Sequence, residues 1–128
     1  FEQAAQAVTW VNAGHTPTLL LSADRSEVRE LLGDNMPLGV TENESYAEHT
    51  TRFAAGDLLL MYSDGLSEAV NAGRVEYGPE RIKALLAHNR AASPPRILER
   101  LRADLHQYTG STTGADDRSA IVIRAIAP

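Results

Sequence analysis

Two acidic positions in this sequence stand where metal-dependent chemistry can be placed. Asp64 comes at the end of the apolar run Leu58–Tyr62, which has the composition of a strand buried on both faces. The pair Asp116 and Asp117 comes just before a second apolar, β-branched run at residues 120–126. A charged group at the edge of a core needs a cation or a metal beside it. The two positions are therefore the first candidates for a functional site.

The chemistry depends on whether these acidic positions meet. If the two runs are antiparallel neighbours in a sheet, the end of one and the start of the other share a rim, and Asp64, Asp116 and Asp117 converge. Carboxylate oxygens in a chain without cysteine suit Mg²⁺ or Mn²⁺, which serve phosphoryl hydrolysis by activating water and neutralising the phosphate. The alternative is that Asp64 only starts a turn through an Asx hydrogen bond, next to Gly65.

The composition excludes several other classes of function. The 128 residues fit a single domain over 1–128, and the first residue, Phe1, suggests a piece of something longer. A net charge of −5 without a basic run indicates neither a nucleic-acid partner nor an anionic membrane surface. The absence of cysteine excludes disulfides and thiolate chemistry and is typical of the cytoplasm, where we expect the protein. No apolar stretch approaches a membrane span, and no signal peptide is visible.

The strands that must position the acids are short. Apolar and β-branched runs predict them at residues 7–12, 18–22, 28–32, 46–53, 58–62 and 120–126. We expect the first two to form a hairpin through the turn at residues 12–17, where Gly14 can take positive φ. The run at 46–53 is the most polar and is predicted to lie at an edge or on a solvated face.

Helices are predicted only in the second half of the chain. One begins at Gly78-Pro79-Glu80, with proline in the first turn. Another is capped by Ser93, starts at Pro94 and stops at Gly110. Its apolar stripe consists of Ile97, Leu98, Leu101, Leu105 and Tyr108. A run of strands, two helices and one closing strand predicts an α+β fold with an antiparallel sheet.

Four segments then support a more specific interpretation. They are residues 11–17 (VNAGHTP), 36–40 (MPLGV), 56–69 (GDLLLMYSDGLSEA) and 115–119 (ADDRS). Together, and in this order, they resemble the bacterial SpoIIE/RsbU branch of the PP2C-like (PPM) metal-dependent protein phosphatases. The resemblance implies an antiparallel β-sandwich with flanking helices. It also implies two Mn²⁺ or Mg²⁺ ions and a bridging water that attacks a phosphoserine or phosphothreonine.

The resemblance also assigns roles to individual residues. Asp64 falls on the metal-binding aspartate of the Ser/Thr-Asp-Gly motif, and Asp116 falls on the ligand that precedes Ser119 by three positions. Asp117 occupies the position where relatives have asparagine or aspartate. It is interpreted either as a metal ligand or as a residue that orients a neighbouring ligand. We therefore predict Asp64 and Asp116 as catalytic, and Asp64, Gly65, Asp116 and Asp117 as the metal site.

The resemblance covers only the C-terminal half of the family's domain. The Gly-Asp-x-x-Gly motif, whose aspartate bridges both metals in the family, has no counterpart in this sequence. The site is then to be completed by a missing segment or by another chain. Because half a sandwich exposes apolar sheet surface, we expect this chain to form a dimer or to exchange part of its domain with a second copy.

Other side chains have two interpretations each. His15 either takes part in the site or is a hydrogen-bonded structural histidine near it. Arg118 either offsets carboxylate charge and meets the phosphate or is a solvated loop arginine. Glu68 is interpreted as a solvated carboxylate, Asp57 as a β-turn residue and Trp10 as core.

The functional hypothesis is a cytoplasmic, Mn²⁺- or Mg²⁺-dependent protein serine/threonine phosphatase. By the resemblance, its substrate is a phosphorylated STAS-type anti-sigma-factor antagonist, with no nucleic acid or membrane as partner. The alternatives are a non-catalytic phosphatase-like interaction module in a partner-switching pathway and a Mg²⁺-dependent phosphohydrolase that acts on small molecules.

Overall fold

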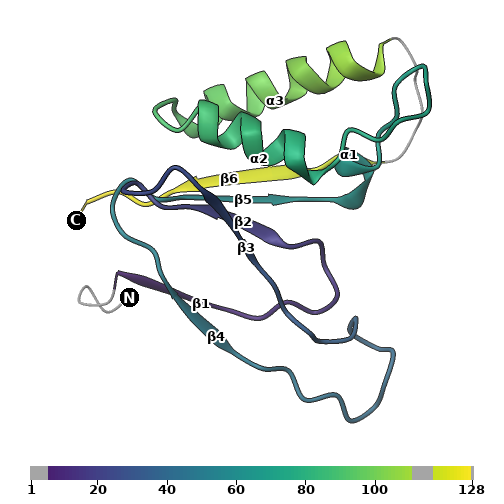
Figure 1. Cartoon of the computed structure of the whole chain (residues 1–128). Coiled ribbons are helices and arrows are strands. Elements are labelled where there is room, and N and C mark those ends of the chain that lie inside the picture. Colours follow the sequence, from purple (N-terminus) through teal and green to yellow (C-terminus); the bar gives the residue numbers. More distant parts are fainter. Residues whose placement is uncertain (1–5, 111–116, 128) are drawn as a thin grey trace.

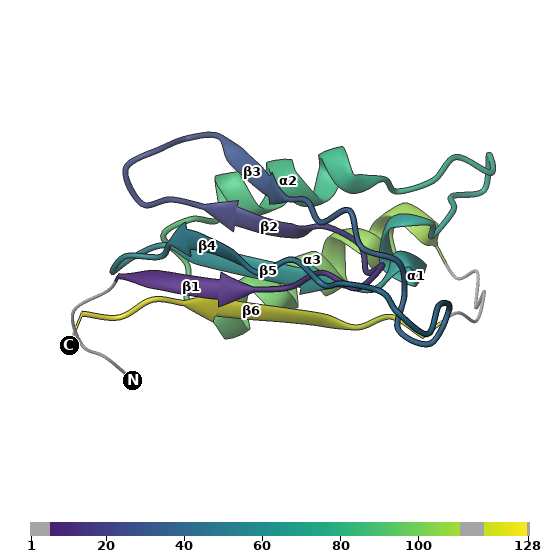
Figure 2. The same cartoon turned by 90° about the horizontal axis from the view of Figure 1, so that it is seen from below.

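The chain is arranged in three layers (Figure 1). The computed structural model describes residues 6–110 and 117–127. A pair of long helices covers one face of a four-stranded sheet, and a two-stranded sheet lies against the other face (Figures 1 and 2). Every strand pairing is antiparallel. The predicted fold class, α+β with antiparallel sheets and flanking helices, is confirmed.

The strands and the two long helices follow one another in the predicted order. The elements are β1 (Ala7–Trp10), β2 (Thr18–Leu21), β3 (Val28–Leu31), β4 (His49–Arg52), β5 (Leu58–Tyr62), α1 (Asp64–Ser67), α2 (Pro79–His88), α3 (Pro94–Thr109) and β6 (Ala120–Arg124). The single-turn helix α1 was not predicted. The larger sheet has the order β3-β2-β5-β6, and β1 pairs with β4. Both long helices begin at the predicted prolines. Gly110 ends α3 with φ of +64°, a conformation that glycine adopts at low cost.

The predicted hairpin between residues 7–12 and 18–22 is wrong. β1 pairs with β4, whereas β2 pairs with β3 and β5 in the other sheet. The Trp10 ring stacks on His49 with centroids 4.6 Å apart, and its Nε1 donates a hydrogen bond to Thr51 Oγ1 at 3.3 Å. The connection after β1 therefore crosses between the layers, and the polar strand β4 gains a partner 41 residues away in sequence.

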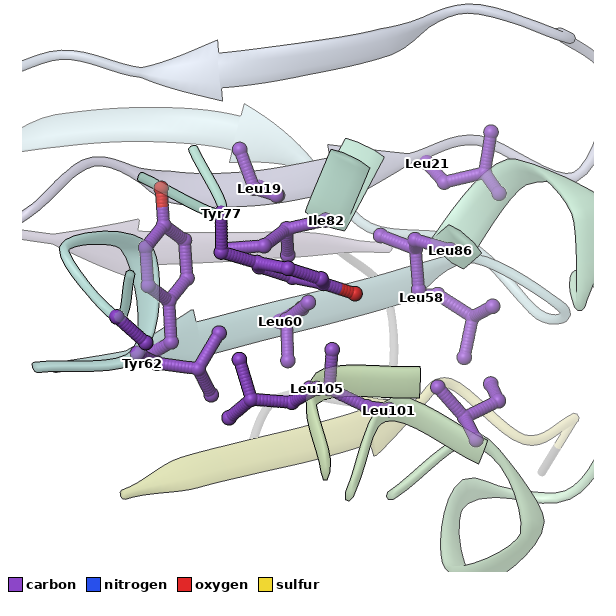
Figure 3. Packing of buried hydrophobic residues seen from close by; sticks show 13 residues of the cluster. Leu19, Leu21, Leu58, Leu60, Tyr62, Tyr77, Ile82, Leu86, Leu101 and Leu105 are labelled. Carbon is purple, nitrogen blue, oxygen red and sulfur yellow. The ribbon is translucent and has the colours of Figure 1, made fainter. Parts of the chain in front are cut away.

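The main core lies between the four-stranded sheet and the helices (Figure 3). Alternate residues of β2 and β5 face it, and the predicted stripe of α3 packs against them. Its members include Leu19, Leu21, Leu58, Leu60, Tyr62, Ile82, Leu86, Ile97, Leu101 and Leu105. The residues between them on the strands face the two-stranded sheet and form a smaller cluster of Leu20, Leu31 and Leu59.

Asp57 has the structural role that the sequence predicted. Its side chain is 1% exposed. Oδ1 accepts a hydrogen bond from the Ala23 amide at 2.8 Å, and Oδ2 accepts one from the Ala54 amide at 2.7 Å. The carboxylate thus fixes the turn before β5 and ties it to the β2–β3 turn, at the end of the sheet away from Asp64.

Candidate functional site

The rim where β5 ends and β6 begins brings the two acidic segments together. Tyr62 lies opposite Ala120 in the antiparallel register. Beyond that pair, the Ser63 amide donates to the Ser119 carbonyl at 3.0 Å, and the Ser119 amide donates to Ser63 Oγ at 3.0 Å. Ser63 Oγ also donates to the Asp117 carbonyl at 3.2 Å. The predicted antiparallel pairing is therefore confirmed, and Asp64 and Asp117 belong to one rim.

Asp64 opens the single-turn helix α1 and is exposed to solvent. Its Oδ1 accepts a hydrogen bond from the Gly65 amide at 2.8 Å, and its carbonyl accepts one from the Glu68 amide at 2.8 Å. The turn-forming interpretation of Asp64 is therefore part of its role. Oδ2 has no hydrogen-bond partner among the described residues, so one oxygen remains available to a cation. Glu68, at the end of α1, is exposed as expected.

The ligand assignment itself stays a prediction. Asp116 lies outside the described residues, and Asp117 is exposed. Within residues 6–110 and 117–127, no group of three or more histidine, cysteine, aspartate or glutamate side chains is placed to hold a metal ion. The set Asp64, Gly65, Asp116 and Asp117 therefore rests on the sequence motif and on the shared rim.

The turn at residues 12–17 is hydrogen-bonded to the same rim. Asn12 Oδ1 accepts a hydrogen bond from the His15 amide at 2.8 Å, and Asn12 Nδ2 donates to the His15 carbonyl at 3.0 Å. Thr16 Oγ1 donates to the carbonyl of Tyr62, two residues before Asp64. Asn12 and Thr16 were not singled out from the sequence. The signal that could have revealed Asn12 is its position at the start of an Asx-type turn.

His15 is an exposed side chain within this turn. Its Nδ1 lies 2.9 Å from the Thr16 carbonyl and 3.1 Å from Thr16 Oγ1. These contacts agree with the interpretation of a hydrogen-bonded histidine near the rim. The contribution of the turn to the site is positional, since it holds the end of β5 through Thr16.

Gly14 connects the turn to the second motif segment. Its φ of +78° is unfavourable for other residues, and a Cβ at this position would lie 2.5 Å from Pro37 Cγ. Asn35 Nδ2 donates a hydrogen bond to the Asn12 carbonyl at 3.0 Å. The motif segments 11–17 and 36–40 are therefore packed together. Glycine is needed at position 14 because a larger residue would collide with Pro37.

The tyrosine before the acidic turn is held neutral. Tyr62 is 4% exposed. Burial, followed by the negative charge of Glu30, raises the pKa of its phenol above the ordinary value of 10.0. Tyr62 therefore contributes packing and its carbonyl to the rim, and no charge at neutral pH.

Comparison with known proteins identifies the family to which this fold and this rim belong. The sequence model of the family described as Stage II sporulation protein E (SpoIIE) matches residues 1–126. The chain belongs to the SpoIIE family. Among curated proteins, Protein IcfG of Synechocystis sp. is 23% identical over 116 residues, which cover 91% of this chain and 18% of IcfG.

Solved structures place this SpoIIE-family chain in the PP2C fold. The SiaA PP2C domain of Pseudomonas aeruginosa matches with a TM-score of 0.79 and 21% identity, over 94% of this chain and 47% of that one. The RsbU and RsbW domains of Rv1364c from Mycobacterium tuberculosis match with a TM-score of 0.71 and 27% identity, over 98% of this chain and 34% of that one. The SpoIIE-family chain thus spans less than half of each of these relatives. None of its described helices is long and apolar enough to cross a bilayer.

Proposed function

We propose that this chain is the C-terminal half of a Mn²⁺- or Mg²⁺-dependent protein serine/threonine phosphatase domain. Membership of the SpoIIE family supports the reaction class. The single observation that carries the proposal is the rim at the end of β5, where the Ser63 hydroxyl holds the backbone of Asp117 beside the turn that contains Asp64. An acid at the end of one core strand and an acid at the start of its neighbour are thereby kept on one edge of the sheet.

The side chains on this rim fit a hard divalent cation. Asp64 and Asp117 are exposed carboxylates, and oxygen ligands are those that Mn²⁺ and Mg²⁺ prefer. Asp64, Gly65, Asp116 and Asp117 would hold the ions. When bound, such a cation lowers the pKa of water and neutralises phosphate charge. The Gly65 amide orients the Asp64 carboxylate through Oδ1, and Thr16 and Ser63 hold the strand end from which it projects.

We place the substrate among phosphorylated regulatory proteins of partner-switching pathways in the cytoplasm, and specifically among STAS-type anti-sigma-factor antagonists. This part of the proposal is supported by the likeness to a protein whose solved structure contains an RsbU and an RsbW domain. The exposure of the rim also suits a protein substrate, because no enclosed cavity needs to form around the phosphoserine.

The test measures Mn²⁺ binding and Mn²⁺-dependent hydrolysis of a phosphoserine peptide by this chain. Asp64→Asn and Asp116→Asn are the test variants. Asp24→Asn is the matched control, since Asp24 is an exposed aspartate in the β2–β3 turn at the other end of the sheet. We expect both test variants to lose Mn²⁺ binding and turnover, and the control to keep them. Binding or turnover that is indifferent to Asp64 and Asp116 would refute the metal site.

A non-catalytic interaction module is the second candidate. The lack of a Gly-Asp-x-x-Gly motif in this sequence favours it for the chain by itself. Mn²⁺ binding that needs Asp64 but produces no turnover would support this candidate. A parallel assay with p-nitrophenyl phosphate separates both candidates from a phosphohydrolase of small molecules, which would prefer the small ester to the phosphopeptide.

A further inference from the structure

A groove between α3 and β6 opens directly beside the candidate rim. It has a volume of about 380 Å³. Leu66, two residues after Asp64 on α1, lines one part of it, and Arg118, which follows Asp117, lines another. The groove is therefore continuous with the proposed phosphoester site through both acidic segments.

The floor of the groove is apolar. Leu101 and Leu105 of α3 are 2% and 5% exposed, and Leu66 is 4% exposed. Leu98, one turn before Leu101 on α3, is only partly buried and presents apolar surface to the groove. A volume of this size is in the range of pockets that accept several side chains or a small ligand.

The ionisable side chains that line this groove among the described residues are Arg102, His106 and Arg118. Within that part of the chain, no aspartate or glutamate lines it. This contrasts with the net charge of −5 for the whole chain. Arg102 is exposed and forms neither an ion pair nor a hydrogen bond through its side chain with any described residue. By contrast, Arg96, on the same helix, is paired with Glu99 at 2.7 Å.

We propose that this groove docks an acidic, amphipathic segment of the phosphorylated substrate protein, next to its phosphoserine. This inference rests on the proposed phosphatase function. Apolar side chains of the substrate segment, such as leucine, fill the space over Leu98 and Leu101, and its carboxylates pair with the exposed Arg102. Such complementarity selects among partners and speeds their association, while the rim itself contacts only the phosphoserine.

The test uses two phosphoserine peptides of equal length. Both carry leucines at helical spacing beside the phosphoserine, and they differ only in that one has glutamates where the other has lysines. Binding is followed by fluorescence anisotropy, and Mn²⁺-dependent hydrolysis is measured in parallel. We expect the unaltered chain to bind the acidic peptide about tenfold more tightly than the basic one, a typical effect of complementary charge.

The variants locate that preference in the groove. Arg102→Glu removes the preference for the acidic peptide, whereas the matched control Arg96→Glu, with the same change in charge on the same helix, keeps it. Leu98→Ser weakens the binding of both peptides. Equal affinity of the unaltered chain for both peptides, or equal losses in Arg102→Glu and Arg96→Glu, would overturn the proposal.

The same measurements separate docking from catalysis. Hydrolysis of p-nitrophenyl phosphate involves no flanking segment, so Arg102→Glu leaves its rate unchanged if the groove only docks the substrate. Peptide binding that follows the predicted pattern without any hydrolysis would refute the phosphatase function of this chain and support the docking groove. Dissociation of a dimer of the chain by Arg102→Glu would instead identify a second copy as the occupant and overturn the proposal.

Discussion

The two faces of the four-stranded sheet differ in how completely they are covered. On the helical face, Leu60 is fully buried beneath α2 and α3. On the opposite face, the two-stranded sheet covers Leu59 but leaves Ile121 and Ile123 of β6 at 56% and 41% exposure. The same strands thus carry a closed core on one side and a partly open apolar surface on the other.

The open face has the form of a groove between the sheets. Its volume is about 390 Å³, and its lining includes Trp10 of β1, Leu59 and Met61 of β5, and Ile121 and Ile123 of β6. Exposed apolar sheet surface is what the sequence resemblance predicted for half of a sandwich, and this part of the expectation is confirmed. The comparison indicates that the helical face supplies most of the stability, while the other face is left for further contacts.

The largest expected effect is the loss of stability when a leucine of β5 is shortened, and it differs between the two faces of that strand. Leu60→Ala removes a side chain from the main core, and we expect a loss of about 3–5 kcal/mol in the free energy of unfolding. Leu59→Ala, at the adjacent position facing the other sheet, is expected to cost about 2–3 kcal/mol, because the open groove beside it can relax or admit water. Urea unfolding of both variants measures the difference. Equal losses would mean that the two faces contribute alike.

The buried carboxylate that joins the two turns at the end of the four-stranded sheet gives the next effect. Asp57→Ala leaves the amides of Ala23 and Ala54 without their buried acceptor, and we expect a loss of about 2 kcal/mol in the free energy of unfolding. Asp57→Asn keeps one acceptor oxygen and should lose less. If Asp57→Ala left the free energy of unfolding unchanged, the two turns would be held by other contacts.

A side-chain hydrogen bond on the helical face gives a smaller effect on stability. The hydroxyl of the buried Tyr77 donates to Asp104 Oδ2 at 2.5 Å. Tyr77→Phe removes this hydrogen bond while keeping the ring, so we expect a loss of about 1 kcal/mol in urea unfolding at neutral pH. A larger loss would mean that the helical face depends on this polar pair more than on its leucines.

The same tyrosine gives a pH dependence. Burial, and then the hydrogen bond to Asp104, raises the pKa of Tyr77 above its ordinary value of 10.0. The unfolded chain therefore releases this proton at a lower pH than the folded chain does. The stability contributed by Tyr77 is present below pH 10.0 and falls as the pH rises above it. The loss between neutral and strongly alkaline pH should be smaller in Tyr77→Phe than in the unaltered chain.

The sequence was informative where local signals agree. The apolar run before Asp64 and the run after Asp117 predicted β5, β6 and their shared rim, because a buried strand needs a continuous apolar sequence. Proline at the first position and a glycine stop predicted α3, since both act within one helical turn.

Elsewhere, the sequence did not predict which segments far apart in the chain contact each other. Nothing local in residues 7–12 indicates pairing with β4 instead of β2, because alternation fixes the face of a strand and not its neighbour. The Thr16 hydroxyl reaches Tyr62 across 46 residues, a contact that no motif spacing reveals. The ligand role of Asp116 stays a prediction, because that residue lies outside the described part of the chain.

The smallest expected effect tests the open face directly. Ile121→Thr keeps a β-branched side chain in β6 but makes the most exposed position of that strand polar. Because Ile121 is already 56% exposed, we expect the free energy of unfolding to change by less than about 0.5 kcal/mol. Self-association, measured by light scattering over a dilution series, should weaken, since an apolar surface of this kind favours contact with a second copy. A dilution-stable monomer in the unaltered chain would contradict the predicted dimer, and a large loss of stability in Ile121→Thr would mean that this face is closed in solution.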